Sequence, residues 1–233
     1  MRLPARSVTF AFVSTLLLFA ALPAQTKPES AKAPSELPAK APAAHPPSEE
    51  LLQRSEKIVT KLGLASPEQQ ARIRDLVAQQ YAELALIHDA RDEALKVAKA
   101  AASEPAAQSA RDTATARQAD LHYAFIARLS AELTQSQVEQ IKDGITYGVL
   151  PNTFRVYQEM LPNLTPEQSN QILAWLTEAR EHAMDAGSSK DKHAWFGKYK
   201  GRINNYLSKA GYDMKQAERD MFSRKNTEAK TSN

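Results

Sequence analysis

The sequence predicts an all-α protein: a single helical domain built on a long antiparallel helical hairpin, with a C-terminal group of shorter helices. The chain has only 7 glycines in 233 residues and is rich in alanine, leucine, glutamine and glutamate, which favour helices. Apolar residues recur three and four positions apart, and Ser or Thr followed by Gln three positions later marks several helix starts. A chain of this length is typical of one domain with one core.

Residues 1–24 predict a signal peptide. Arg2 and Arg6 precede an apolar run at residues 8–22, and Pro-Ala-Gln at residues 23–25 offers a cleavage point. The run is shorter than the ~20 residues that a membrane helix needs, so we expect cleavage, with an uncleaved anchor as the alternative. The chain has no cysteine for disulfides or lipid attachment. We therefore expect a periplasmic or secreted protein that is not integral to the membrane.

Residues 25–48 predict a disordered linker. They contain six prolines and one large aliphatic residue, Leu37. Apolar burial cannot offset the entropy lost on ordering such a segment, so we expect a spacer.

Residues 49–225 are expected to form the helical domain. Ser48 is the expected N-cap of a first helix that ends at Gly63. A longer second helix begins after Ser66, and a third runs over about residues 106–130, after an interrupting proline. The second and third helices are predicted to make the antiparallel hairpin.

Capping boxes predict where other helices begin. Thr134 with Gln137 and Thr165 with Gln168 each place a capping hydroxyl three positions before a glutamine. Ser66 begins a third such box. Helix initiation accounts for these residues without any further function.

The remaining stretches complete the C-terminal helical group. Glycines and prolines between the two threonine boxes predict a loop with a short helix at residues 154–161. Further helices are expected at residues 166–186, 191–210 and 214–224. Residues 226–233 are expected to form a disordered tail.

The charge balance argues against a nucleic-acid partner. Without Arg2 and Arg6 of the leader, the chain has 28 basic residues against 27 acidic ones. A general nucleic-acid binder would show a clear basic excess.

Two short segments resemble a motif of known stress proteins. LTQSQ at residues 133–137 and LTPEQ at residues 164–168 are similar to the LTxxQ motif of the Spy/CpxP periplasmic proteins, which are small helical chaperones. The resemblance implies a chaperone-like activity as one alternative function.

A second resemblance covers nearly the whole domain. It is carried by IVTKLGL (58–64), QQYAELALIHDARD (79–92), KDGITYGVLP (142–151), LPNLTPEQ (161–168), residues 172–188 and AWFGKYKGRINNYLSKAGY (194–212). These segments resemble a bacterial family of exported proteins that is catalogued as a domain of unknown function and described as a candidate sugar-binding family. The resemblance implies a helical exported domain and assigns no site residue.

The C-terminal stretch is both basic and aromatic. Residues 190–225 contain ten basic, four acidic and six aromatic residues. Within one helix, aromatic and basic side chains recur on a shared face, which predicts either a core face or a platform for a ring-shaped ligand. Neighbouring amide and charged groups suit a sugar. The predicted ligand-binding residues are Trp195, Tyr199, Lys200, Arg202, Asn205 and Tyr206.

Two glycines lie inside the same predicted helix. Gly197 and Gly201 each cost about 1 kcal/mol relative to alanine in a helix interior. We therefore expect something to approach the backbone there, either another helix or a ligand.

A polar cluster is expected on the preceding helix. Glu178, His182 and Asp185 share one helical face and are residue types that bind metals or perform acid–base chemistry. The same spacing is typical of a solvated face, as is the polar run that begins at His88. No recognised motif accompanies either set, so we assign no catalytic residue, metal or cofactor.

Together these observations favour an exported, non-enzymatic protein that binds carbohydrate or another component of the cell envelope. A chaperone-like stress protein is one alternative. A glycan-active enzyme that uses Glu178, His182 and Asp185 is another.

Overall fold

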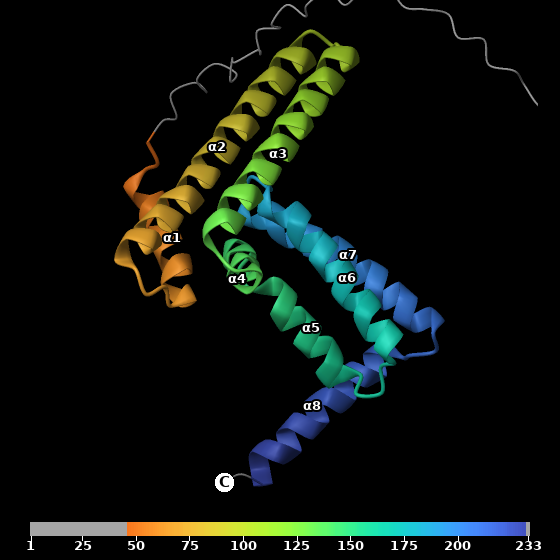
Figure 1. Cartoon of the computed structure of the whole chain (residues 1–233). Coiled ribbons are helices and arrows are strands. Elements are labelled where there is room, and N and C mark those ends of the chain that lie inside the picture. Colours follow the sequence, from red (N-terminus) through yellow and green to blue (C-terminus); the bar gives the residue numbers. More distant parts are fainter. Residues whose placement is uncertain (1–45, 232–233) are drawn as a thin grey trace, which may run out of the picture. The chain divides into compact units, whose positions relative to one another are not determined.

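The computed structural model describes residues 46–231. This part of the chain contains eight α-helices, one 3₁₀ turn and no strand, which confirms the all-α prediction (Figure 1). None of the described helices is both long enough and apolar enough to span a membrane. The predicted signal peptide, residues 1–24, and nearly all of the predicted linker, residues 25–48, lie outside the described residues.

The first half of the domain contains the two longest helices. It consists of α1 (Glu49–Val59), the 3₁₀ turn η1 (Thr60–Leu62), α2 (Pro67–Ala100) and α3 (Glu104–Glu132). Helices α2 and α3 lie side by side and run in opposite directions (Figure 1). Pro105 falls in the first turn of α3, where a backbone N–H has no intrahelical acceptor. The proline therefore starts this helix rather than delaying it to residue 106.

The second half contains shorter helices. They are α4 (Gln135–Ile145), α5 (Val149–Met160), α6 (Pro166–Met184), α7 (Ser189–Lys209) and α8 (Met214–Thr231). Helices α6 and α7 form a closely packed pair, and α5 packs against both α6 and α8. Helix α4 packs against α1, α3 and α6, so it connects the two halves.

Two predicted boundaries are wrong. Much of the loop expected before residue 154 belongs to α5, because Gly148 makes a left-handed turn at φ 66° and Pro151 sits in the first turn of the helix. The disordered tail expected at residues 226–233 is helical as far as Thr231. No glycine or proline interrupts α8, so nothing ends the helix earlier.

Side-chain caps fix several helix starts. Thr134 and Thr165 form full capping boxes with their glutamines, as predicted. Ser66 caps α2, but the Gln69 side chain donates to the carbonyl oxygen of Glu132 at the end of α3 (Nε2–O 2.7 Å). The third box is therefore not formed, and Gln69 instead ties the two long helices together.

Two clusters of buried apolar side chains hold the helices together. The first core lies mainly among α1 to α4, and the second lies among α5 to α8. Met184, in the last turn of α6, belongs to the first core, so α6 reaches from one core to the other. Fully buried side chains include Ile73, Phe125, Leu129 and Ile141 in the first core, and Ile172, Leu176, Phe196 and Ile203 in the second.

Gly197 and Gly201 do not mark a close helix crossing. A Cβ atom built at either position would meet no atom of another element within 4 Å, so the expected helix contact is wrong. The close approach lies at Gly144 in α4, where a Cβ would be 2.5 Å from Cγ2 of Ile58. The glycine allows α1 and α4 to pack at this distance.

Replacement of Gly197 or Gly201 by alanine should raise the free energy of unfolding by about 0.5–1 kcal/mol, because the methyl group has open space and alanine is the better helix former. Gly144→Ala should lower it by about 1–3 kcal/mol, because the methyl group collides with Ile58. Urea unfolding of the three single variants measures both effects. A loss of stability in G197A or G201A would show that these positions are packed.

Candidate functional site

The six predicted ligand-binding residues do not share one site. Tyr199 is only 5% exposed and belongs to the second core. Burial raises its pKa to about 12, so it remains a neutral phenol within the domain. The other five residues border three different hollows.

Three of the predicted residues line an open groove between α6 and α7. We call this the Trp175 groove; its volume is about 600 Å³, and Trp175, Arg202, Asn205 and Tyr206 line it, with Lys198, Gly201 and Lys209. The Trp175 and Tyr206 rings meet edge to face with centroids 5.2 Å apart. The Arg202 guanidinium lies over the indole, 4.6 Å from its centroid. Gly201, with nothing near its backbone, helps to keep this groove open.

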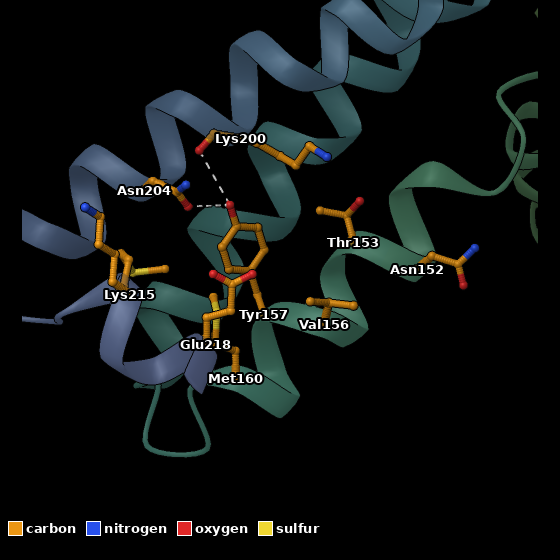
Figure 2. Close-up of a pocket in the computed structure, with 10 residues that line it drawn as sticks. Asn152, Thr153, Val156, Tyr157, Met160, Lys200, Asn204, Lys215 and Glu218 are labelled. Carbon is orange, nitrogen blue, oxygen red and sulfur yellow. Dashed lines mark hydrogen bonds between the residues drawn. The ribbon is translucent and has the colours of Figure 1, made fainter. Parts of the chain in front are cut away.

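Lys200 lines a different pocket, of about 440 Å³, among α5, α7 and α8 (Figure 2). Figure 2 shows the Tyr157 hydroxyl directed at α7, where it donates to Oδ1 of Asn204 (2.7 Å). Burial raises the pKa of Tyr157 to about 12. The Tyr157 hydroxyl and the Asn204 side chain at the back of this pocket are thus paired with each other.

Trp195 lines a third hollow, which we call the histidine cleft. This cleft has a volume of about 610 Å³ and lies where α2, α3, α6 and the start of α7 meet. Its ionisable and aromatic lining residues are His88, Arg91, His122, Tyr123, Glu181, His182, Asp185, Asp191 and Trp195. A hollow with convergent polar groups is the usual setting for a ligand site.

His122 is held between two carboxylates of α6. Its Nδ1 lies 2.9 Å from Oδ2 of Asp185, and its Nε2 lies 3.6 Å from Oε2 of Glu181. The hydrogen bonds to these carboxylates raise the pKa of His122 to about 9. Burial opposes the charge of Glu181, but hydrogen bonds and the positive charges of His122 and Lys142 lower its pKa to about 2. The lining of the cleft therefore includes a cationic imidazole, His122, and an ionised carboxylate, Glu181, at neutral pH.

Asp185, the residue after α6, is the main polar centre of the cleft. Its backbone carbonyl oxygen lies 2.8 Å from Nε2 of His88 and accepts from Nε2 of Gln118 at 3.2 Å. Its carboxylate Oδ1 is buried and has no hydrogen-bond partner among the described residues. One acceptor in this network is thus left unused, which is uncommon for a buried oxygen.

Two aromatic surfaces border these polar groups. The Trp195 indole stacks on the His182 ring, with centroids 4.4 Å apart and an interplanar angle of 17°. Tyr123 is 73% exposed and meets His122 edge to face at 5.6 Å. The cleft therefore combines flat apolar faces with charged and amide groups.

The polar cluster predicted on α6 is only partly correct. His182 and Asp185 line the cleft, whereas Glu178 lies outside it and pairs with Arg202 at 3.7 Å. His88 is buried rather than solvated, because its ring reaches the carbonyl group at the end of α6. The sequence pattern did not identify His122 or Trp175, because neither carries a local signal that separates a site residue from a packing residue.

The cleft does not have the arrangement of a metal centre. No group of three or more His, Asp or Glu residues in the described part of the chain is placed to hold a metal ion. The two nitrogens of His122 both face carboxylates, so neither is free to act on a substrate. What the cleft offers is charge, hydrogen-bonding groups and aromatic faces.

Comparison with known proteins places the chain in a family. A family described as "Protein of unknown function (DUF3826)" matches residues 48–227, so the chain belongs to this family. The resemblance to a family of unknown function is therefore confirmed, while sugar binding and the likeness to Spy/CpxP proteins stay predictions. No curated protein matches the chain.

The free energy of unfolding should fall as the pH rises from 6.5 to about 8, above which the lowered pKa of Lys192 opposes the decline. The pKa of His122 is raised from 6.5 to about 9, so its contribution to stability is fully present below pH 6.5 and lost above pH 9. The pKa of Glu181 is lowered from 4.5 to about 2, so its contribution is present above pH 4.5 and lost toward pH 2. Urea unfolding across this range measures both.

Two histidine variants isolate the alkaline effect. His122→Asn should be less stable than the wild type at pH 6.5 and should lose the decline between pH 6.5 and about 8. His193→Asn, which changes an exposed histidine outside the cleft, should keep the wild-type profile. An unchanged decline in H122N would contradict the assignment to His122.

Proposed function

We propose that this protein is an exported, non-enzymatic protein that binds carbohydrate, and that the histidine cleft is its binding site. The observation that carries the proposal is the position of Trp195. Its indole, backed by His182, borders a cleft of about 610 Å³ that also presents carboxylates, an amide and an arginine. This is the one predicted aromatic residue that shares a hollow with so many polar groups.

The lining of the cleft matches the chemistry of a sugar. A pyranose ring has apolar C–H faces that pack on aromatic rings, and a rim of hydroxyl groups that donate and accept hydrogen bonds. Trp195 and Tyr123 supply the rings, Glu181 and Asp185 supply acceptors, and Gln118 supplies an amide. In the free protein these groups hold one another, since Glu181 and Asp185 face His122 and Gln118 donates to the Asp185 carbonyl group.

The Trp175 groove extends the proposed site along the same helices. Trp175 precedes His182 by seven residues on α6, which corresponds to about 10 Å along the helix axis at ~1.5 Å per residue. Tyr206 and Arg202 of α7 lie beside it. We therefore propose an oligosaccharide, rather than a single sugar, as the ligand.

A glycan-active enzyme is the second candidate, because His182 and Asp185 line the cleft. General acid catalysis needs a group that can hold and release a proton near neutral pH. The pKa of Glu181 is about 2, and both nitrogens of His122 are engaged by carboxylates. These features favour binding over catalysis.

A chaperone-like function would need a broad apolar surface for unfolded clients. The large apolar side chains that are exposed in the described residues come from different helices, including Leu86 and Val97 of α2, Val156 of α5, Leu173 of α6 and Phe222 of α8. This spread favours the carbohydrate proposal. Suppression of aggregation of a denatured test protein at near-stoichiometric ratio would reverse the preference.

Trp195→Ala should weaken oligosaccharide binding by about tenfold, since ~1.4 kcal/mol corresponds to tenfold and a stacking contact contributes ~0.5–1.5 kcal/mol beyond the area that it buries. A glycan array identifies ligands, and calorimetric titration of neutral and acidic oligosaccharides measures the effect. Phe222→Ala, which removes an exposed ring on α8 outside the cleft, is the matched control. Trp175→Ala should weaken only the longer ligands.

The same titrations separate the alternatives. New reducing ends that accumulate with time would establish turnover and replace the binding proposal with the enzyme. The absence of binding to any glycan, or equal glycan affinity of W195A and the wild type, would contradict the carbohydrate-binding proposal.

A further inference from the structure

A small cavity adjoins the histidine cleft. It has a volume of about 80 Å³ and shares His88 and Gly187 with the cleft. Arg54 of α1, Tyr81 of α2 and Lys192 of α7 line it, together with the first residues of α7. We call it the Arg54–Lys192 cavity.

Two cations meet in this cavity without a carboxylate partner. Lys192 is 4% exposed, and its Nζ donates to the carbonyl oxygen of Met184 at 3.0 Å. Arg54 donates to the Tyr147 hydroxyl at 2.6 Å and lies 4.6 Å from the centroid of the Tyr81 ring. Neither forms an ion pair with a carboxylate among the described residues. Lys192 is buried and Arg54 is partly buried, and a buried charge is normally paired, so a second cation beside Lys192 is unusual.

Positive charge exceeds negative charge around Lys192. Burial and the positive charge of Arg54 together lower the pKa of Lys192 to about 8, and the charge of Asp185 opposes them only in part. The Asp185 carboxylate is also bound to His122. An anion in the cavity would therefore face two cations whose mutual repulsion it removes.

Further hydrogen-bond donors line the same cavity. The O–H group of Tyr81 has no acceptor among the described residues, and burial raises its pKa to about 12, so it stays protonated. His88 is 8% exposed, and its buried Nδ1 has no partner in this part of the chain. In the neutral ring Nε2 donates to the Asp185 carbonyl oxygen and Nδ1 is an acceptor, so His88 donates into the cavity only when an anion binds together with a proton on Nδ1.

The start of α7 adds a partial positive charge. Ser189 and Lys190 are the first two residues of this 21-residue helix, so their backbone N–H groups have no intrahelical acceptor. Ser188 and Ser189 line the cavity. Helix N-termini of this kind stabilise bound anions.

We infer that the Arg54–Lys192 cavity binds a small oxyanion, a carboxylate or a sulfate-like group, between the two cations and the start of α7. A water molecule occupies ~30 Å³ in the liquid, so the cavity holds one such group and excludes a sugar ring or a nucleotide. This inference stands apart from the carbohydrate proposal. If both proposals are correct, one acidic glycan could occupy both hollows. His88 and Gly187 line both of them, so its acidic group would lie in the cavity and its sugar ring in the neighbouring cleft.

Calorimetric titration with sulfate, phosphate, acetate and glucuronate, at constant ionic strength set with chloride, tests the inference. The wild type should show saturable binding, and Arg54→Met and Lys192→Met should each weaken it by tenfold or more. Lys57→Met, which removes an exposed cation from the same helix as Arg54, is the matched control and should bind as the wild type does. Glucuronate and acetate report a carboxylate ligand, while sulfate and phosphate report a tetrahedral one.

Thermal melts distinguish a role of Arg54 and Lys192 in anion binding from a role in stabilising the fold. Sulfate stabilises most proteins by exclusion from their surface, so the difference between R54M and K57M is the informative quantity. R54M also loses the hydrogen bond to Tyr147 and the contact with the Tyr81 ring, so the quantity to compare is the shift in melting temperature that each anion produces, not the anion-free midpoint. Lys192 also holds the Met184 carbonyl group, so a folding defect in K192M leaves R54M as the deciding variant.

The pH dependence of anion binding and two further variants complete the test. Anion binding should weaken as the pH rises through about 8, because Lys192 loses its charge there. W195A should keep anion binding, and R54M should keep binding of neutral oligosaccharides, so failure of one proposal is distinguishable from failure of the other. The inference is overturned by an absence of saturable binding for all four anions, or by equal affinity of R54M and the wild type.

Discussion

The arrangement of the two cores depends on how the C-terminal part of α6 is held. Arg180 is 3% exposed there, and its guanidinium pairs with Asp143 at 2.8 Å and with Glu139, both on α4. The two carboxylates are partly exposed, but the buried guanidinium needs them to offset the hydration that it loses. Because α4 contributes to the first core and α6 mainly to the second, this ion-pair network fixes one core against the other.

The carbonyl groups at the end of α6 explain why polar side chains gather at this point. The last carbonyl groups of a helix have no intrahelical donors, and they attract positive charge. Lys192 of α7 donates to the oxygen of Met184, while His88 of α2 and Gln118 of α3 reach the oxygen of Asp185. Donors from three helices thus converge on one helix end. The histidine cleft and the Arg54–Lys192 cavity both border this point.

The sequence predicts those parts of the fold that depend on neighbours along the chain. The Thr134 and Thr165 boxes join residues three positions apart, so their pattern alone predicts the helix starts. The histidine cleft combines His88, His122 and Asp185, which belong to three helices and have no common spacing. Tyr199 and Tyr206 share a face of α7, yet only Tyr206 borders a groove, because the side chains of α6 opposite each position decide its exposure.

The connection between α6 and α7 gives the two adjoining hollows a common wall. A Cβ atom at Gly187 would lie 3.0 Å from Cγ of His88, so glycine lets this ring pack against the connection while Nε2 reaches Asp185. His88 and Gly187 line both the cleft and the cavity. A ligand with a ring in the cleft and an acidic group in the cavity would contact α1, α2, α3, α6 and α7 at once. Since such a ligand binds only the folded arrangement, its binding energy would stabilise the contact between the two cores.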